Sequence, residues 1–202
     1  MKHASTQVLF DYWNQQRGRR RAPMRSDIDP ADIRHVLADI FMVASDFAGD
    51  IRFRLAGTRV CALFAREIKG EAFNGLWSET SRAQVDDLLT AVLNENVGVV
   101  AGVLGRSADG AEVELELLLL PLAFDGRSRV RALGALVALA PPYWLGEQPV
   151  IELELRTLRH LGAEQCDIGA PRFGEVGEPS HTRHGFVVYQ GGRGLPAGKR
   201  TG

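Results

Sequence analysis

Apolar residues recur at helical spacing in four parts of the chain. Residues 5–16 predict an amphipathic helix. The pair Asp29-Pro30 predicts the start of a second helix, because an aspartate cap followed by proline is favoured at a helix N-terminus. A short helix is predicted over 58–66, and the longest one is predicted to start at Ser81, where the residues fit a capping box.

Alternating apolar residues predict five strands. Residues 40–47 and 51–56 read as a hairpin with its turn near Ala48–Asp50. Three strands follow the longest predicted helix, and Asp-Gly turns separate them: Val99–Arg106, Val113–Phe124 and Val130–Ala140. This order predicts an α+β fold, in which helices pack on one face of a five-stranded antiparallel sheet and an N-terminal amphipathic helix is added.

The chain is predicted to have three parts. Residues 1–28 form the N-terminal helix and an arginine-rich linker, residues 29–141 form the domain, and residues 142–202 form a largely mobile C-terminal extension. Within that extension, residues 150–161 fit both a strand and a helix, and residues 186–189 fit one short strand.

Composition narrows the class of protein. The chain has 202 residues, 45% apolar and 24% charged, as expected for one globular domain with appendages. A net charge of −1 argues against wholesale nucleic-acid binding. The two cysteines, Cys61 and Cys166, fit reduced thiols in a reducing compartment. No signal peptide is visible and no apolar run is long enough to span a membrane, so a cytoplasmic location is expected.

Several local sequences together resemble the PAS fold. They are the block Leu9-Phe10-x-Tyr12-Trp13, the run from Pro23 to Pro30, and Phe53-Arg54-Leu55-Ala56-Gly57-Thr58-Arg59 followed by Arg66-Glu67-x-x-Gly70. The likeness covers roughly residues 7–140. More narrowly, the chain resembles a family of small single-domain PAS proteins found mainly in alphaproteobacteria. Residues 184–189 echo that family's tail. Ala65 departs from it, standing where the family has glycine, and a helix is expected to accommodate alanine there.

The resemblance implies a non-enzymatic regulatory or sensory protein that binds a small ligand or a protein partner. Its interior is the expected place for a small apolar ligand, with these candidate pocket residues: Phe53, Leu55, Val60, Phe64, Trp77, Leu88 and Val92. The apolar stripe of the first helix is the expected interface for a second copy or a signalling partner, with these candidates: Val8, Leu9, Tyr12 and Trp13. The identity of the ligand and of the partner stays open.

The residues expected of two common PAS cofactors are missing. No histidine occurs between residues 41 and 159, which disfavours a histidine-ligated haem. Cys61 lies outside the Asn-Cys-Arg-Phe-Leu block of photoactive flavin domains, which disfavours that cofactor and leaves Cys61 as a buried small side chain. His181, His184 and Cys166 are too scattered to predict a metal site. The cofactor therefore stays unknown.

Two alternatives to a sensory role stay open. The first is that an anionic nucleotide or nucleic acid binds to a run of basic residues, which are Arg17, Arg19, Arg20, Arg21 and Arg25. A solvated helix end is the simpler interpretation of this run, and nucleic acid is not favoured. A small-molecule enzyme would need a buried acid or base. Glu112, Glu114 and Glu116 alternate with apolar residues and are expected on a solvent-facing side of a strand.

Overall fold

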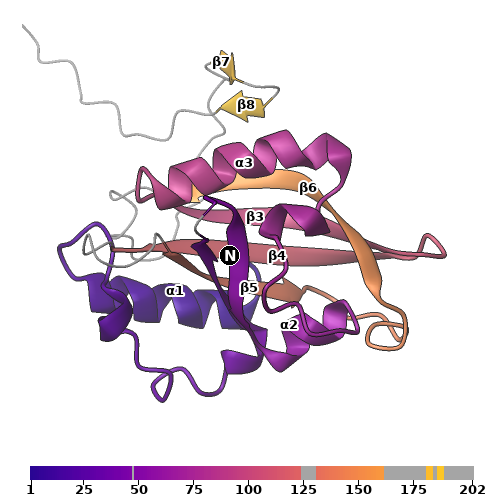
Figure 1. Ribbon diagram of the computed structural model, residues 1–202, viewed down its shortest axis with the longest axis horizontal. Coiled ribbons are helices and arrows are strands. Elements are labelled where there is room, and N and C mark those ends of the chain that lie inside the picture. Colours follow the sequence, from indigo (N-terminus) through magenta and orange to yellow (C-terminus); the bar gives the residue numbers. More distant parts are fainter. Residues whose placement is uncertain (47, 124–130, 162–180, 184–185, 189–202) are drawn as a thin grey trace, which may run out of the picture. The chain divides into compact units, whose positions relative to one another are not determined.

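One antiparallel sheet organises the protein (Figure 1). The computed structural model describes residues 1–46, 48–123, 131–161, 181–183 and 186–188. Within these residues the sheet has six strands in the order β2-β1-β5-β4-β3-β6. The strands are β1 (Ile40–Ser45), β2 (Ile51–Ala56), β3 (Gly98–Ser107), β4 (Glu112–Leu122), β5 (Arg131–Ala138) and β6 (Val150–Leu161). The α+β class is thus confirmed, with one strand more than predicted.

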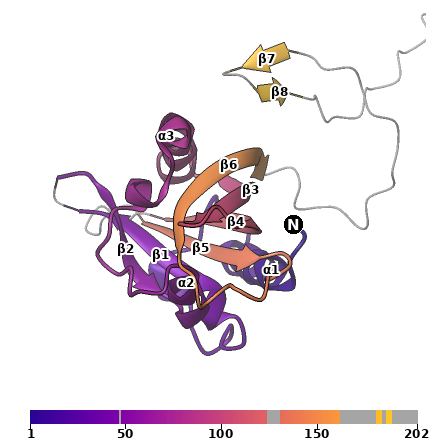
Figure 2. The same ribbon diagram turned by 90° about the vertical axis from the view of Figure 1, so that its right-hand side faces the viewer.

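Helices cover both faces of this sheet (Figure 2). The described elements are α1 (Ala4–Arg17), α2 (Thr58–Leu63), α3 (Glu79–Leu93) and three 3₁₀ turns, η1 (Arg25–Asp27), η2 (Leu37–Asp39) and η3 (Phe73–Leu76). α2, η3 and α3 pack on what we call the inner face, and α1 packs on the opposite, outer face. The prediction that the helices of the domain share one face holds for α2 and α3, and α1 adds a third layer.

Each face has its own apolar core, because side chains of a strand alternate between faces. Leu115, Leu117 and Leu119 of β4 belong to the inner core with the helices α2 and α3. Leu118 and Leu120 of the same strand belong to the outer core with α1.

The prediction of a helix after Asp29-Pro30 is wrong. Residues 30–36 form successive turns that lead into η2. The backbone N–H groups of Asp32, Val36 and Asp39 donate to carbonyls three residues earlier instead of four. Ile33 and Val36 are still buried, so consecutive turns satisfy the same apolar spacing that a helix would.

The start of α3 also differs from its prediction. Ser78, not Ser81, precedes the first helical residue. The Ser81 hydroxyl oxygen instead accepts a hydrogen bond from the backbone N–H of Leu155 in β6, at 3.0 Å. The side chain expected to cap the helix therefore ties α3 to an edge strand.

β6 makes residues 150–161 part of the sheet. Its pairing with β3 runs from Gly98 opposite Leu161 to Ser107 opposite Val150. The domain therefore extends past residue 141, and the boundary predicted there is wrong. Beyond residue 166 the chain forms a second compact unit, in which β7 (His181–Arg183) pairs antiparallel with β8 (Phe186–Val188). The short strand predicted at 186–189 is confirmed for its described residues.

Candidate functional site: grooves beside the N-terminal helix

Six of the seven predicted pocket residues lie in the inner core. Each is at most 2% exposed: Phe53, Val60, Phe64, Trp77, Leu88 and Val92. Aromatic rings touch one another across this core, with centroids 5.5 Å apart for Phe53 and Phe73 and 5.8 Å apart for Phe73 and Trp77. These side chains therefore pack against each other. One polar atom stands out: the Trp77 indole N–H is buried and has no hydrogen-bond acceptor among the described residues.

Leu55 is not a pocket residue. Its side chain is 48% exposed. The pairing of β1 with β2 shifts between Met42, which faces Leu55, and Val43, which faces Phe53. Arg54 is the extra residue at this bulge, so Leu55 turns to the face opposite that of Phe53. Strict alternation along β2 had placed both side chains on one face.

The apolar stripe of α1 is covered by the protein's own sheet. Leu9 and Trp13 are 0% and 5% exposed, and both belong to the outer core. The Trp13 indole N–H donates to the Pro121 carbonyl of β4 at 2.8 Å, and the Tyr12 hydroxyl accepts from the backbone N–H of Asp29 at 2.8 Å. The helix, which was predicted to form a part separate from the domain, therefore packs on the sheet, and only Val8 of the predicted interface residues is half-buried.

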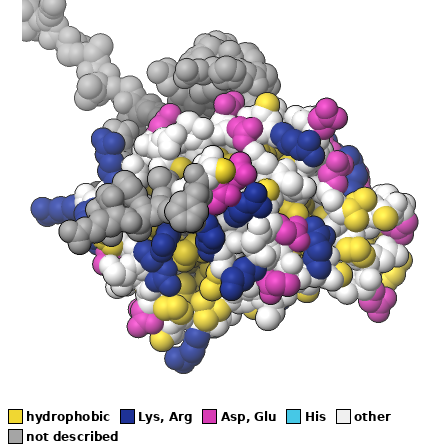
Figure 3. Space-filling view, in the orientation of Figure 1, with side chains coloured by type: hydrophobic (Ala, Val, Ile, Leu, Met, Phe, Trp, Pro, Cys, Tyr) yellow, Lys and Arg dark blue, Asp and Glu magenta, His cyan; other side chains and the backbone are white. Residues whose placement is uncertain are grey.

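Most of the predicted anion-binding arginines are engaged inside the chain. Arg17 is buried and lies over the Trp13 ring at 5.3 Å. Arg20 forms an ion pair with Asp27 at 2.7 Å, and Arg25 donates to a backbone carbonyl. Arg19 and Arg21 are exposed. On the face seen in Figure 3, Lys and Arg side chains are interspersed with Asp and Glu side chains. Arg20 also donates to the backbone carbonyls of Gln16 and Arg17, at the end of α1.

Glu116 is buried, although the alternating pattern predicted that it faces solvent. It is 5% exposed, whereas Glu112 and Glu114 are exposed as predicted. Its carboxylate accepts from the backbone N–H groups of Lys2 at 2.7 Å and His3 at 3.1 Å, and from the Thr6 hydroxyl at 2.5 Å. Burial would raise the pKa of Glu116, but these hydrogen bonds outweigh it and the pKa is lowered.

Asp39 is a second buried carboxylate at the start of α1. It accepts from the Ser5 hydroxyl at 2.6 Å and from two nitrogens of Arg59, at 2.5 Å and 2.7 Å. Burial opposes its ionisation, but hydrogen bonds from Arg59 and Ser5 hold the pKa of Asp39 below its ordinary value. Carboxylates near a helix N-terminus also interact favourably with the helix dipole. Glu116 and Asp39 thus fix the start of α1 to the sheet and to α2.

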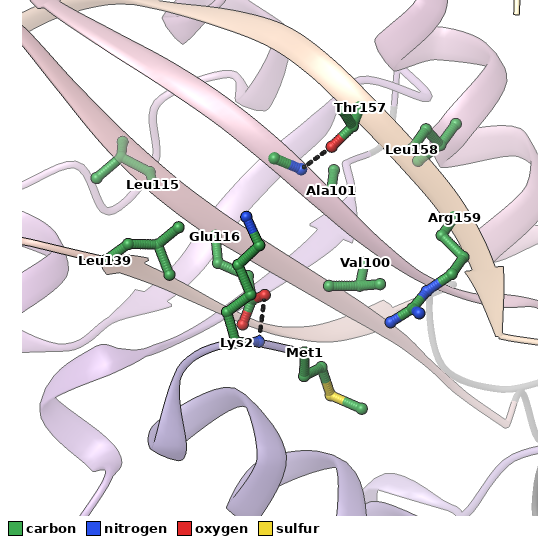
Figure 4. A pocket seen from close by; sticks show the side chains of 11 residues that line it. Met1, Lys2, Val100, Ala101, Leu115, Glu116, Leu139, Thr157, Leu158 and Arg159 are labelled. Atoms are coloured by element: carbon green, nitrogen blue, oxygen red, sulfur yellow. Dashed lines mark hydrogen bonds between the residues drawn. The ribbon is translucent and has the colours of Figure 1, made fainter. Parts of the chain in front are cut away.

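Two grooves flank this polar junction. We call the first, of about 430 Å³, the β6 groove. Lys2, Glu116, Val100, Thr157 and Arg159 are among the residues that line it (Figure 4). The second, which we call the α2 groove, has a volume of about 400 Å³. Its walls include the following residues: His3, Ser5, Asp39, Arg59, Leu63, Leu136 and Leu145. Leu139 lines both grooves.

The buried carboxylates hold structure together; their geometry does not suit acid–base chemistry. Both oxygens of Glu116 and both oxygens of Asp39 already accept hydrogen bonds, and lowered pKa values keep them ionised. Among the described residues, no three His, Cys, Asp or Glu side chains are grouped so as to hold a metal ion. Cys166 and His184, two of the donors weighed above, lie outside those residues.

None of the helices in the described part of the chain combines the length and apolar character that a bilayer crossing needs.

Cys61 is partly buried on α2, where burial raises the pKa of its thiol.

Several solved structures are similar to part of this chain. A PAS domain from Colwellia psychrerythraea is 19% identical, and the match covers 55% of this chain and 97% of that one with a TM-score of 0.40. A light-oxygen-voltage domain studied with a flavin analogue is 13% identical, with coverages of 56% and 85% and a TM-score of 0.44. A light-oxygen-voltage protein of Rhodobacter sphaeroides is 14% identical, with coverages of 57% and 71% and a TM-score of 0.42.

Sequence comparison decides the family. No curated protein matches the chain. A family model described as "PAS domain" matches residues 1–137, and this range includes α1, both buried carboxylates, strands β1 to β4 and all of β5 except Ala138. The chain belongs to the PAS domain family.

Proposed function

We propose that this protein is a non-enzymatic sensory PAS domain. It binds a small ligand in the grooves beside α1 and transmits ligand binding to a protein partner through that helix. One observation carries the proposal: the β6 groove and the α2 groove meet at the start of α1. Lys2 lines one groove and His3 and Ser5 line the other. A ligand in either groove therefore touches both the sheet and the residues that lead into α1.

The junction between the grooves supports this coupling. Glu116 of β4 and Asp39 of η2 hold the start of α1 by hydrogen bonds to Lys2, His3, Ser5 and Thr6. A ligand that shifts Lys2 or Ser5 changes these bonds directly. A small displacement at the start of a rigid helix moves the whole helix, which is how a local contact reaches a distant surface.

The interior is a second candidate site, favoured by the buried Trp77 indole N–H, which has no acceptor among the described residues. A buried donor without an acceptor costs about 1–3 kcal/mol, so such groups are rare in folded proteins. A small apolar ligand with one carbonyl or ether oxygen would satisfy the donor. Because the surrounding side chains are packed closely, such a ligand would have to displace some of them.

One experiment separates the two sites. The full chain, with ¹⁵N and methyl labels, is screened by NMR against a library of small fragments. We expect binding fragments to shift the signals of Gly102 and Leu139 beside the grooves and of Ser5 at the start of α1. Shifts centred on Trp77 and Leu88 would assign the interior as the site. A screen in which no fragment shifts any of these signals would contradict ligand sensing altogether.

A further inference from the structure

The β6 groove combines an apolar floor with a cationic rim. Val100 and Leu139 contribute apolar side chains to its surface. Lys2 extends from the segment before α1 and Arg159 extends from β6, and Figure 4 shows Val100 between these two cationic side chains. A volume of about 430 Å³ lies within the range of ~300–1,000 Å³ that is typical of small-molecule sites.

Both cations are available to a ligand. Within the described residues, the ion pairs engage Arg20, Arg52, Arg59, Arg66, Arg106 and Arg156. Neither Lys2 nor Arg159 has a carboxylate within ion-pair distance in that part of the chain. Lys2 uses its backbone N–H, not its ammonium group, to bond Glu116. Two cations that have no ion-pair partner among the described residues face this groove, and this arrangement favours an anion.

The carboxylate in the wall does not block an anion. Glu116 is the acidic residue that lines this groove. Its oxygen Oε2 accepts from Lys2 N–H, and Oε1 accepts from His3 N–H and Thr6 Oγ1. Its negative charge is directed at the start of α1, where the helix dipole offsets it. The cationic rim is therefore not neutralised by Glu116.

A hydroxyl group adds a third donor. Thr157 of β6 accepts a hydrogen bond from the backbone N–H of Gly102 at 3.1 Å, which leaves its own proton for a ligand (Figure 4). A Cβ at position 102 would lie 2.6 Å from this hydroxyl oxygen. Glycine is thus needed at position 102 to keep the Thr157 hydroxyl where it is.

We propose that the β6 groove binds an amphiphilic anion, a small molecule with one carboxylate or phosphate group and a compact apolar body. Lys2, Arg159 and Thr157 hold the anionic group, and Val100 and Leu139 contact the apolar body. The bound anion links the start of α1 to the edge strand β6. This inference rests on the proposed function, because it names the ligand class of one of the two grooves.

Calorimetry with the full chain and decanoate as the probe tests the ligand class. We expect saturable binding at one site in low salt, with affinity falling as salt is added. Decanol, which has the same apolar body without the charge, should bind at least about tenfold more weakly. Lack of decanoate binding, or equal affinity for decanol, would overturn the inference.

Substitutions test the site. Arg159→Gln and Lys2→Gln should each weaken decanoate binding by about threefold to tenfold, and Thr157→Val should weaken it without changing the charge of the protein. Arg21→Gln is the matched control, since it removes one exposed positive charge elsewhere and should leave the affinity unchanged. Equal losses in the control and in the groove variants would show non-specific attraction and overturn the site.

Two further arms complete the test. Sedimentation with phosphatidylcholine–phosphatidylglycerol vesicles separates a free anion from a lipid surface, and we expect no binding to vesicles that depends on Arg159. Vesicle binding that is lost in Arg159→Gln would overturn the assignment of a free ligand. If decanoate fails to bind while fragments still shift Ser5 from the α2 groove, this inference fails and the proposed function stands.

Discussion

Ala65 occupies a position that favours glycine. Its φ of 49° lies in the left-handed region, at the end of α2. The backbone N–H of Arg66 donates to Cys61 and that of Ala65 donates to Ala62, the two bonds of a Schellman motif. The resemblance to the single-domain PAS family already showed alanine here in place of glycine. The expectation that a helix accommodates this alanine is wrong, because α2 ends at Leu63, before Ala65.

Ala65→Gly should therefore stabilise the protein. Removing the strain of a left-handed alanine is worth about 1 kcal/mol. Urea unfolding should show a higher midpoint with an unchanged slope. Ala62→Gly, three residues earlier inside the same helix, is the control and should destabilise by about 1 kcal/mol. Destabilisation by both substitutions would contradict this account of Ala65.

Glu116→Gln should destabilise the protein at neutral pH. An amide keeps one acceptor oxygen and places an NH₂ group where the Lys2 N–H, the His3 N–H or the Thr6 hydroxyl requires an acceptor. The expected loss is about 1–3 kcal/mol by urea unfolding. Glu114→Gln, on the exposed side of the same strand, should change stability by less than about 0.5 kcal/mol.

The stability difference between wild type and Glu116→Gln should depend on pH. The folded-state pKa of Glu116 is below its ordinary value of 4.5, so between these two values the unfolded chain binds a proton that the folded chain does not. Stability from the ionised carboxylate is complete above that ordinary value and is lost as the pH falls through the folded pKa. The difference between wild type and Glu116→Gln should shrink on acidification; a difference that grows would contradict this.

How far β4 could be predicted depends on what lies over each residue. Alternation of charged and apolar residues placed Glu112 and Glu114 correctly. Glu116 follows the same pattern, yet Lys2 and His3, more than 100 residues earlier in the chain, close over it. The prediction that Leu55 faces the same side as Phe53 is wrong for a related reason, since a bulge changes the face on which a residue lies without changing the sequence pattern. Local periodicity cannot report either effect.

At the scale of elements, α1 is part of the domain and not an appendage. Its apolar stripe was recognised from sequence, but the surface that it covers was not, because an exposed stripe and a buried stripe have the same spacing. Leu9→Ala should cost about 3 kcal/mol in urea unfolding, as expected for a fully buried leucine. Val8→Ala, one residue away and half-buried, should cost less than half of that. Equal costs would contradict the docking of α1.

β6 is the element that the sequence left undecided. Its residues fit helix and strand alike, and the decision comes from β3, which would otherwise present an unpaired edge. A chain ending at residue 141 should therefore be poorly soluble, whereas a chain ending at residue 161 should remain soluble and show cooperative unfolding. Light scattering and thermal unfolding measure this. A soluble, cooperative 1–141 chain would show that β6 is dispensable.

At the scale of the whole molecule, family and fold were predictable, whereas the site that we propose was not. The PAS resemblance directed attention to the interior, where six of the candidate residues indeed lie but pack against each other. The grooves are formed by residues from both ends of the described domain, such as Lys2 and Arg159. No local motif joins these residues, because only the pairing of β6 with β3 and the docking of α1 bring them together.

The central claim is that ligands bind in the grooves beside the start of α1. Methyl NMR of the full chain titrated with decanoate tests it most directly. We predict that the largest shifts occur at Val100 and Leu139, with smaller shifts of the Ser5 amide. Largest shifts at Leu88 and Val92, in the inner core, would contradict the claim and place the ligand in the interior.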